Sequence, residues 1–179
     1  RWASRVAIAS TMALACLGRS RRQPMTIIAQ TINVNNRQRM IFLRKIMSII
    51  NTHKLTRIGI LGLSFKPNTD DLREAPSLDI VRALADKKLR LKAYDPACMD
   101  AFKKLFPRIR YCRDAYETAA GSELLLILTE WNEFKELDLR QIKKLMARDI
   151  IVDGRNIYPL TMMREHGFVY HSIGRPTVK

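Results

Sequence analysis

Leu124-Leu125-Leu126-Ile127-Leu128 is a run of apolar residues with no polar interruption. Strands inside a parallel sheet are covered on both faces, so their sequences are continuously apolar instead of alternating. The run is also shorter than an ordinary helix, which needs about ten residues or more. It therefore predicts a central strand of a parallel sheet, over residues 124–129.

The segments around this strand alternate between short apolar stretches and helical patterns. Further strands are predicted at residues 57–61, 89–94, 150–152 and 168–173. Helices are predicted at residues 76–85, where Pro76 suits the first turn, and at 98–106, 114–120 and 137–146. This alternation predicts an α/β fold: a Rossmann-like parallel sheet flanked by helices, with right-handed connections.

The segment from Pro24 to Asn51 has a helical pattern before the first predicted strand. Leu43, Ile46, Met47 and Ile50 recur at positions i, i+3, i+4 and i+7, which places them on one stripe of a helix. A helix of this length is expected to run between domains or to pack on a partner. We therefore divide the chain into residues 1–56, which end with this helical segment, and an α/β domain over residues 57–179.

Composition limits the class of protein. The 179 residues, 47% of them hydrophobic, are enough for one domain with a helical attachment. No stretch reaches the roughly 18 uninterrupted apolar residues of a membrane-spanning helix, so no membrane association is expected. Three cysteines, at positions 16, 98 and 112, form no CxxC pair. This excludes a disulfide scaffold and a zinc ribbon, and it favours a reducing compartment, the cytoplasm.

Charge is distributed unevenly along the chain. Lys and Arg number 32 against 17 Asp and Glu, a net charge of +15, yet residues 1–57 hold 11 basic residues and no acidic one. A basic chain can bind nucleic acid or anionic lipid, but no nucleic-acid motif accompanies the charge, so this partner is disfavoured. The residues from Val6 to Leu17 are mostly apolar and also mimic a secretory signal. The simpler hypothesis is a basic segment taken from a larger protein.

Three loops are expected at the carboxyl ends of strands, where open parallel sheets bind ligands: residues 62–73, 129–131 and 153–156. The first carries Lys66 and Arg73, which are suited to phosphate oxygens. Surface pairing with Asp70, Asp71 or Glu74 is the alternative. Arg155, on the third loop, is either an anion contact or the partner of Asp153 in a salt bridge.

Nothing in these residues alone predicts catalysis. Gly59 and Gly62 form only G-x-x-G, which is weak as a nucleotide-binding signal. The three histidines lack the spacing of metal ligands, and no cysteine has a neighbouring histidine to activate it. Trp131 and Phe134 either stack on a base or cover the core. From the residues alone, the prediction is a domain that binds an anion or a nucleotide.

Several motifs, in order, resemble one known family. Residues 58–74, IGILGLSFKPNTDDLRE, resemble the GLxFKxxTDDxRxSP signature of the nucleotide-sugar 6-dehydrogenases, the UDP-glucose/GDP-mannose dehydrogenase family. The similarity continues through YDP at 94–96, TEW at 129–131, DGRN at 153–156 and GFVYHSIGRP at 167–176, while residues 34–38 look like the end of the family's central dimerisation helix. It covers about residues 24–176. The TEW and DGRN motifs are more similar to the UDP-glucose 6-dehydrogenases than to the GDP-mannose enzymes.

The resemblance implies an NAD-dependent oxidoreductase of polysaccharide biosynthesis. Such enzymes oxidise UDP-glucose to UDP-glucuronate in two steps and reduce two NAD⁺. An N-terminal domain holds NAD, a central helix forms the homodimer, and a C-terminal domain holds UDP. By position in the motifs, Phe65 and Lys66 would lie along the UDP part of the substrate and Arg155 near the substrate. Arg73 would reach the NAD phosphates.

The chain departs from the family at its start. The family's GFGGSCxPKD motif, with the nucleophilic cysteine, should precede Thr11, but residues 1–10 read RWASRVAIAS, with Val6 in the place of that cysteine. Cys16 lies outside the motif, so no residue is predicted to be catalytic. We expect a C-terminal portion that is inactive alone, with residues 1–23 partly translated out of frame. Two alternatives stay open: an interaction module that pairs with an intact subunit, or a dehydrogenase for another nucleotide sugar.

Overall fold

The computed structural model describes residues 13–14, 16–18, 20–21, 23 and 25–179. The chain divides into two compact units, Arg1–Met47 and Ser48–Lys179. The RWASRVAIAS segment, including Val6, lies outside the described residues. So does most of the stretch expected to be out of frame.

A helix of 28 residues, α2 (Thr26–His53), occupies the segment with the helical pattern and confirms that prediction. Its first half exposes large apolar side chains, among them Ile27 at 84% and Val34 at 54%. These two residues also line a shallow surface hollow together with Thr26, Gln30, Thr31 and Asn35. In the described parts of the chain, no helix is both long enough and apolar enough to cross a bilayer.

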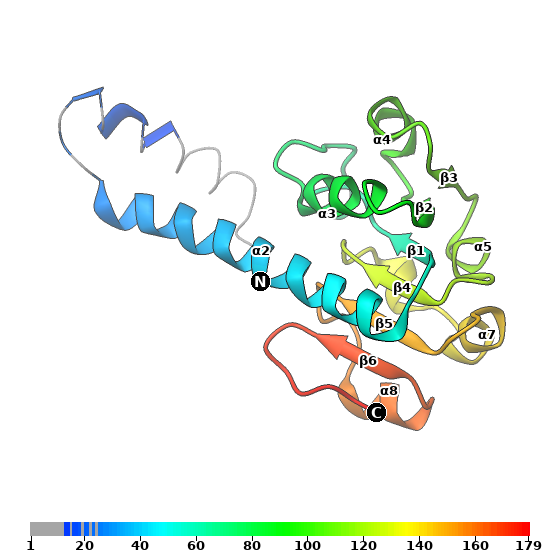
Figure 1. Ribbon diagram of the computed structural model, residues 1–179. Coiled ribbons are helices and arrows are strands. Elements are labelled where there is room, and N and C mark those ends of the chain that lie inside the picture. The colour runs from blue at the N-terminus through cyan, green and yellow to red at the C-terminus, as the bar shows by residue number, and fades with distance from the viewer. Residues whose placement is uncertain (1–12, 15, 19, 22, 24) are drawn as a thin grey trace. The chain divides into compact units, whose positions relative to one another are not determined.

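A six-stranded sheet forms the centre of the second unit, in the order β3-β2-β1-β4-β5-β6 (Figure 1). All five neighbouring pairs are parallel. This doubly wound arrangement confirms the α/β, Rossmann-like prediction. The strands are β1 (Arg57–Leu61), β2 (Arg90–Tyr94), β3 (Arg110–Tyr111), β4 (Leu124–Ile127), β5 (Ile150–Asp153) and β6 (Val169–Ser172).

The helices follow the predictions closely, with two additions. The predicted helices appear as α3 (Pro76–Ala85), α4 (Met99–Leu105), α5 (Ala115–Ala119) and α7 (Leu139–Leu145). The sequence pattern predicts neither the helices α6 (Asn132–Lys135) and α8 (Leu160–Glu165) nor the strand β3. Each is too short for a hydrophobic period to be read from it, because α6 is a single turn and β3 has only two residues.

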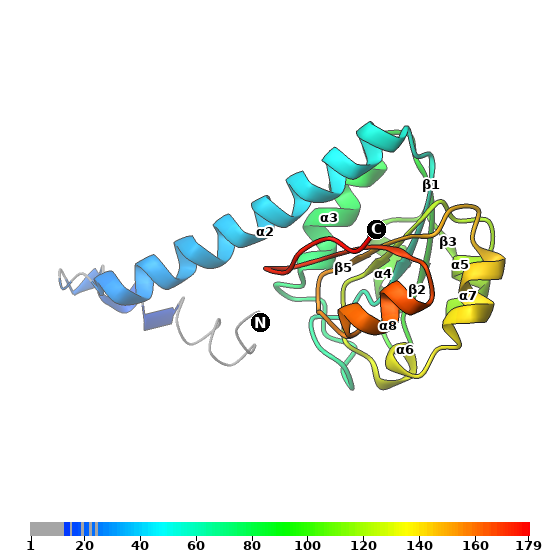
Figure 2. The ribbon, with the colours of Figure 1, turned by 90° about the horizontal axis from the view of Figure 1, so that it is seen from below.

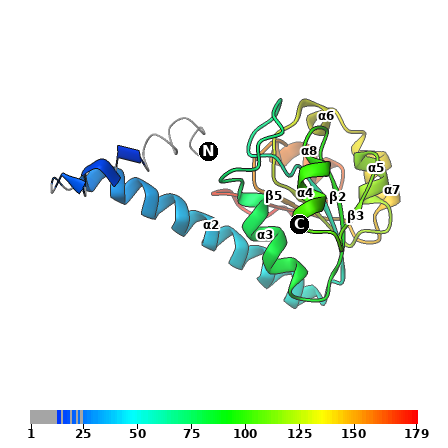
Figure 3. The same cartoon turned by 90° about the horizontal axis from the view of Figure 1, so that it is seen from above.

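The core confirms β4 as a central strand, since all its residues are buried. Leu125 and Ile127 point to one face, where they join a cluster that takes side chains from α5 to α8, including Phe134 and Ile142. Leu124 and Leu126 point to the other face, because strand side chains alternate. Figures 2 and 3 show α3 on one face of the sheet and α6 and α8 on the opposite face.

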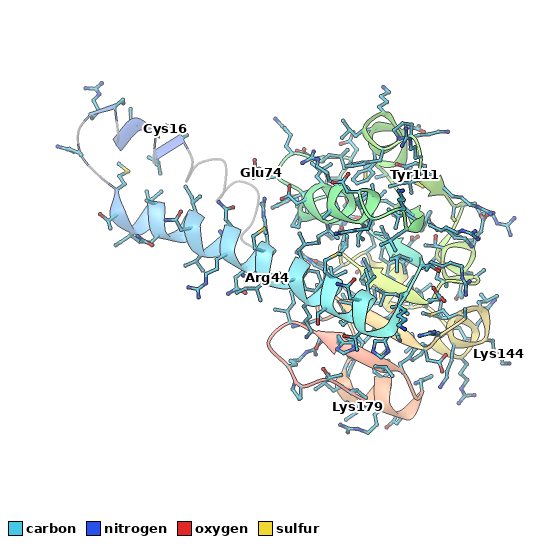
Figure 4. All side chains as sticks on the ribbon, viewed as in Figure 1. Cys16, Arg44, Glu74, Tyr111, Lys144 and Lys179 are labelled. Atoms are coloured by element: carbon cyan, nitrogen blue, oxygen red, sulfur yellow. The ribbon has the colours of Figure 1, made fainter. Side chains whose placement is uncertain are left out.

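Because the strands are parallel, their carboxyl ends meet at one edge of the sheet. The loop between β1 and α3 leaves this edge, and α7 ends near the other edge. In Figure 4, Glu74 on that loop and Lys144 on α7 lie at opposite ends of the second unit. The three loops that the sequence analysis singled out therefore share one edge.

Candidate functional site

The β1 loop starts with a glycine that no other residue can replace without strain. Gly62 has φ +86°, in the left-handed region, and a Cβ atom there would lie 2.6 Å from the backbone nitrogen and the Cβ of Thr129. Thr129 in turn donates a hydrogen bond from Oγ1 to the Ser64 carbonyl, at 2.6 Å. The β1 loop is thus fastened to the end of β4.

Asp95, directly after β2, is a fully buried hub for this loop. Its Oδ2 accepts hydrogen bonds from the amides of Leu63 (2.7 Å) and Ser64 (3.0 Å) and from Trp131 Nε1 (3.1 Å). Its Oδ1 accepts from the amides that begin the β2–α4 turn. Burial alone would raise the pKa of Asp95, but the hydrogen bonds from backbone amides outweigh it and hold the pKa below its usual value. A charged carboxylate therefore joins the loops of three strands.

Phe65 and Lys66 follow immediately on this fixed backbone. The Phe65 side chain is buried, and its amide donates to the Asp71 carbonyl at 3.0 Å, which closes the loop on itself. Lys66 is exposed and makes no ion pair with any residue that the structure describes. Its predicted alternative role, as a surface cation paired with a neighbouring acid, is therefore not what the structure contains.

Arg73 differs from Lys66 in having a partner. Its Nε and Nη2 each lie 3.2 Å from an Asp71 carboxylate oxygen, while its side chain is 78% exposed. The Asp71 side chain is only 8% exposed, so a buried carboxylate holds one side of the guanidinium while the rest of the arginine faces solvent. The pairing alternative from the sequence analysis thus describes Arg73 in this structure.

A second buried aspartate organises the β5 loop. Asp153 accepts hydrogen bonds from the amides of Arg155 (2.7 Å) and Asn156 (2.8 Å) on Oδ1. Its Oδ2 accepts from the Ile157 amide (2.7 Å) and from the Tyr170 hydroxyl (2.6 Å). The turn that carries Arg155 is therefore built around this carboxylate.

The side chain of Arg155 pairs with Glu130, not with Asp153. Its Nε donates to Glu130 Oε2, and the Arg155 side chain is only 10% exposed. The salt bridge to Asp153 considered in the sequence analysis is wrong in its partner: Asp153 holds the backbone of Arg155. The reason is local geometry, because an aspartate at the start of a turn faces the amides that follow it.

Other candidate groups do not form a second site. Trp131 and Phe134 are buried in the core cluster, so they cover the core and are not free to stack on a base. Cys98 and Cys112 are buried, and burial raises the pKa of both thiols, which makes them poor nucleophiles. Among the described residues, no three metal-ligating side chains gather.

Sequence reasoning missed two residues of this edge. In the sequence, Asp95 stands out only as part of the YDP motif and Glu130 only as part of the TEW motif. An aspartate directly after a predicted strand is a usable signal, since it can accept from the amides of a neighbouring loop. Glu130 offered no such signal, because its partner lies 25 residues away in sequence.

The fold and this edge define a class of protein. In doubly wound sheets, ligands bind at the carboxyl ends of the strands, and exposed or preoriented cations there suit phosphate groups. Here the carboxyl edge presents Lys66 and Arg155 on loops that buried aspartates fix in place. The second unit has the architecture of a Rossmann-like nucleotide-binding domain.

Comparison with known proteins identifies the family. Residues 59–159 match the UDP binding domain of the UDP-glucose/GDP-mannose dehydrogenase family. The chain is 39% identical over 170 residues to UDP-glucose 6-dehydrogenase TuaD of Bacillus subtilis (strain 168), covering 94% of this chain and 37% of that protein. It is 40% identical over 167 residues to UDP-glucose 6-dehydrogenase of Rhizobium meliloti (strain 1021), covering 93% and 38%. The chain belongs to the UDP-glucose/GDP-mannose dehydrogenase family, as its motifs predicted.

A solved structure agrees with this assignment. The UDP-glucose dehydrogenase of the hyperthermophilic archaeon Pyrobaculum islandicum has a TM-score of 0.72 and 27% identity to this chain. The match covers 92% of this chain and 36% of that one. The chain thus spans well under half the length of the relatives that it matches.

Proposed function

We propose that this chain is the C-terminal, UDP-binding portion of a UDP-glucose 6-dehydrogenase. The complete enzyme would oxidise UDP-glucose to UDP-glucuronate and reduce two NAD⁺, in the cytoplasm, as a step of polysaccharide biosynthesis. Residues 57–179 would be the UDP-sugar-binding domain, and residues 1–56 a degenerate N-terminus followed by the central dimerisation helix. A dehydrogenase for another nucleotide sugar is the alternative, because the residues that contact the hexose would lie mostly in the part of the relatives that these 179 residues do not cover.

The single observation that carries this proposal is the state of Lys66. It is an exposed ammonium group with no ion pair among the described residues, on a loop whose backbone Asp95 and Thr129 fix in place. A preorganised, unpaired cation at the carboxyl edge is what a diphosphate needs. Arg155 would supply a second cationic contact with the substrate. Phe65, buried beside Lys66, would anchor the loop along the UDP.

Calorimetric titration with UDP tests the proposal. We expect the parent chain to bind UDP and Lys66→Ala to bind about tenfold more weakly, the effect of losing one charge-assisted contact. Lys144→Ala is the matched control, since it also removes an exposed lysine but at the opposite end of the unit. A parent chain that does not bind UDP, or equal weakening by both variants, would refute the role of Lys66.

NAD is the proposed cofactor of the complete enzyme, and Arg73 the residue of this chain that would reach its phosphates. The 78% exposure of the Arg73 side chain supports this, because a phosphate can reach the guanidinium from solvent. We expect no NAD-dependent turnover of UDP-glucose from this chain alone, since residues 1–10 read RWASRVAIAS where the family has its cysteine motif, and burial makes Cys98 and Cys112 poor nucleophiles. Measurable NADH formation by the purified chain would contradict this expectation.

A homodimer through α2 is the proposed assembly. The exposed apolar side chains of Ile27, Val34, Met40 and Ile41 support it, because a helix with such a surface is stabilised by a partner. The same observation supports the alternative function, a non-catalytic module that pairs with an intact subunit. Sedimentation of the purified chain tests self-association, and co-purification with a tagged full-length relative tests pairing.

A further inference from the structure

Arg155 is held at two points by two different strands. Its backbone amide donates to Asp153 at the end of β5, at 2.7 Å, and its Nε donates to Glu130 in the loop after β4. The loop after β4 is itself fastened, through Thr129 Oγ1, to the Ser64 carbonyl of the β1 loop. The Arg155 side chain is therefore connected to the loop that carries Lys66 through two contacts, Arg155 with Glu130 and Thr129 with Ser64.

The turn around Arg155 is also fixed from the other side. Asn156, with φ +57°, donates from Nδ2 to the Ile173 carbonyl and accepts from the Ile173 amide, both at 2.9 Å. The Tyr170 hydroxyl, which donates to Asp153, lies 3.2 Å from Arg175 Nη2. These contacts leave the backbone of the turn little freedom, so the remaining variable is the direction of the Arg155 side chain.

Glu130 occupies only one position of the arginine fork. A guanidinium group has five N–H donors, one on Nε and four on the two terminal nitrogens. Within the part of the chain that the structure describes, Nε is the only nitrogen of the Arg155 guanidinium with a partner. The two terminal nitrogens, the pair best arranged for two parallel bonds to an oxyanion, are thus available.

We infer that Glu130 is a positioning residue, which holds Arg155 by Nε so that its two terminal nitrogens face a phosphate or sugar oxygen of the ligand. This inference rests on the proposed function, since it needs a ligand at this edge. Glu130 acts by removing rotamer freedom from Arg155 before binding, which lowers the entropic cost of the complex. It also neutralises a guanidinium that is 90% buried and would be costly without a partner.

Simple electrostatics predicts the opposite effect of removing Glu130 on the affinity for UDP. A carboxylate beside an anion site repels the ligand and competes with it for Arg155, so its removal should strengthen UDP binding. If Glu130 positions Arg155, its removal should weaken UDP binding. The direction of the change therefore separates positioning from masking.

The test is calorimetric titration of UDP into the full chain and its variants. We expect Glu130→Ala to bind UDP about tenfold more weakly than the parent. Glu130→Gln keeps an oxygen that can accept from Nε, so its loss should be smaller, about threefold. Glu136→Ala is the matched control: it removes an exposed carboxylate from the same loop region and should leave binding unchanged or slightly stronger.

A double-mutant cycle separates positioning of Arg155 from a general structural role. Arg155→Ala should weaken binding, and adding Glu130→Ala to it should cause no further loss, because the residue to be positioned is gone. An additional loss of similar size in the double variant, or tighter binding of Glu130→Ala or Glu130→Gln, would overturn the inference. If the parent does not bind UDP, the proposed function fails first. If the parent binds and Arg155→Ala has no effect, this inference alone fails.

Discussion

Replacing Asp95 by asparagine should destabilise the second unit strongly, although the two side chains have the same size. In the structure, Oδ2 accepts from the amides of Leu63 and Ser64, from Ser64 Oγ and from Trp131 Nε1. Oδ1 accepts from the amides of Ala97 (2.9 Å) and Cys98 (3.1 Å). Every one of these groups is a donor, so the NH₂ group of asparagine must face donors in either orientation.

The loss of unfolding free energy in Asp95→Asn can be estimated from the orientation of the asparagine amide that breaks fewer hydrogen bonds. With the NH₂ group in the place of Oδ1, two hydrogen bonds to a charged group are lost, at about 1.5–3 kcal/mol each. The bonds to the remaining oxygen also lose their charge assistance. We expect the free energy of unfolding to fall by about 4 kcal/mol, and Tm to fall by about 12 °C for a chain of this size.

Thermal and urea unfolding of the parent and of Asp95→Asn, followed by circular dichroism, measures this loss. Asp86→Asn is the control, because Asp86 is exposed at the end of α3 and the same chemical change there should cost less than about 0.5 kcal/mol. A loss below about 1 kcal/mol for Asp95→Asn would refute the argument. It would mean that the loops of β1, β2 and β4 do not depend on the charged carboxylate.

Two further predictions concern the same edge and the response to acid. Gly62→Ala should lower the free energy of unfolding by about 3 kcal/mol, because it adds a steric clash with Thr129 to the strain of a left-handed alanine. Gly121→Ala, with φ +69° but no atom within 4 Å of its Cβ, should cost only about 1 kcal/mol in the same unfolding assay, and equal losses would contradict the packing argument. Asp95, and also Glu123, which accepts from the Thr56 amide, have pKa values below their usual ones, so they stabilise the fold above their unfolded pKa of about 4. The free energy of unfolding should therefore fall as pH drops from about 5 towards 3, and it should fall less steeply in Asp95→Asn. Unfolding curves that do not change with pH over this range would refute the prediction.

Much of the fold could be predicted because its signals are local. The apolar run around Leu126 and the helical period before His53 each describe one element, and a period needs only neighbouring residues. The elements that were missed, β3, α6 and α8, are too short for any period. Tertiary contacts hold them in place: β3 pairs with β2, and Phe134 of α6 and Met163 of α8 are buried in the core cluster.

The sequence by itself determined the α/β class, the order of the long elements and the motifs that place the chain in its family. It also brought Lys66, Arg73 and Arg155 to the carboxyl edge of the sheet, since that follows from parallel strands. Only the tertiary structure decided which of these cations has a partner. Asp95 meets the Ser64 amide across 31 residues and Glu130 meets Arg155 across 25, and such contacts depend on which strands lie side by side. Residue spacing along the chain does not contain that information, because it arises only when the sheet assembles.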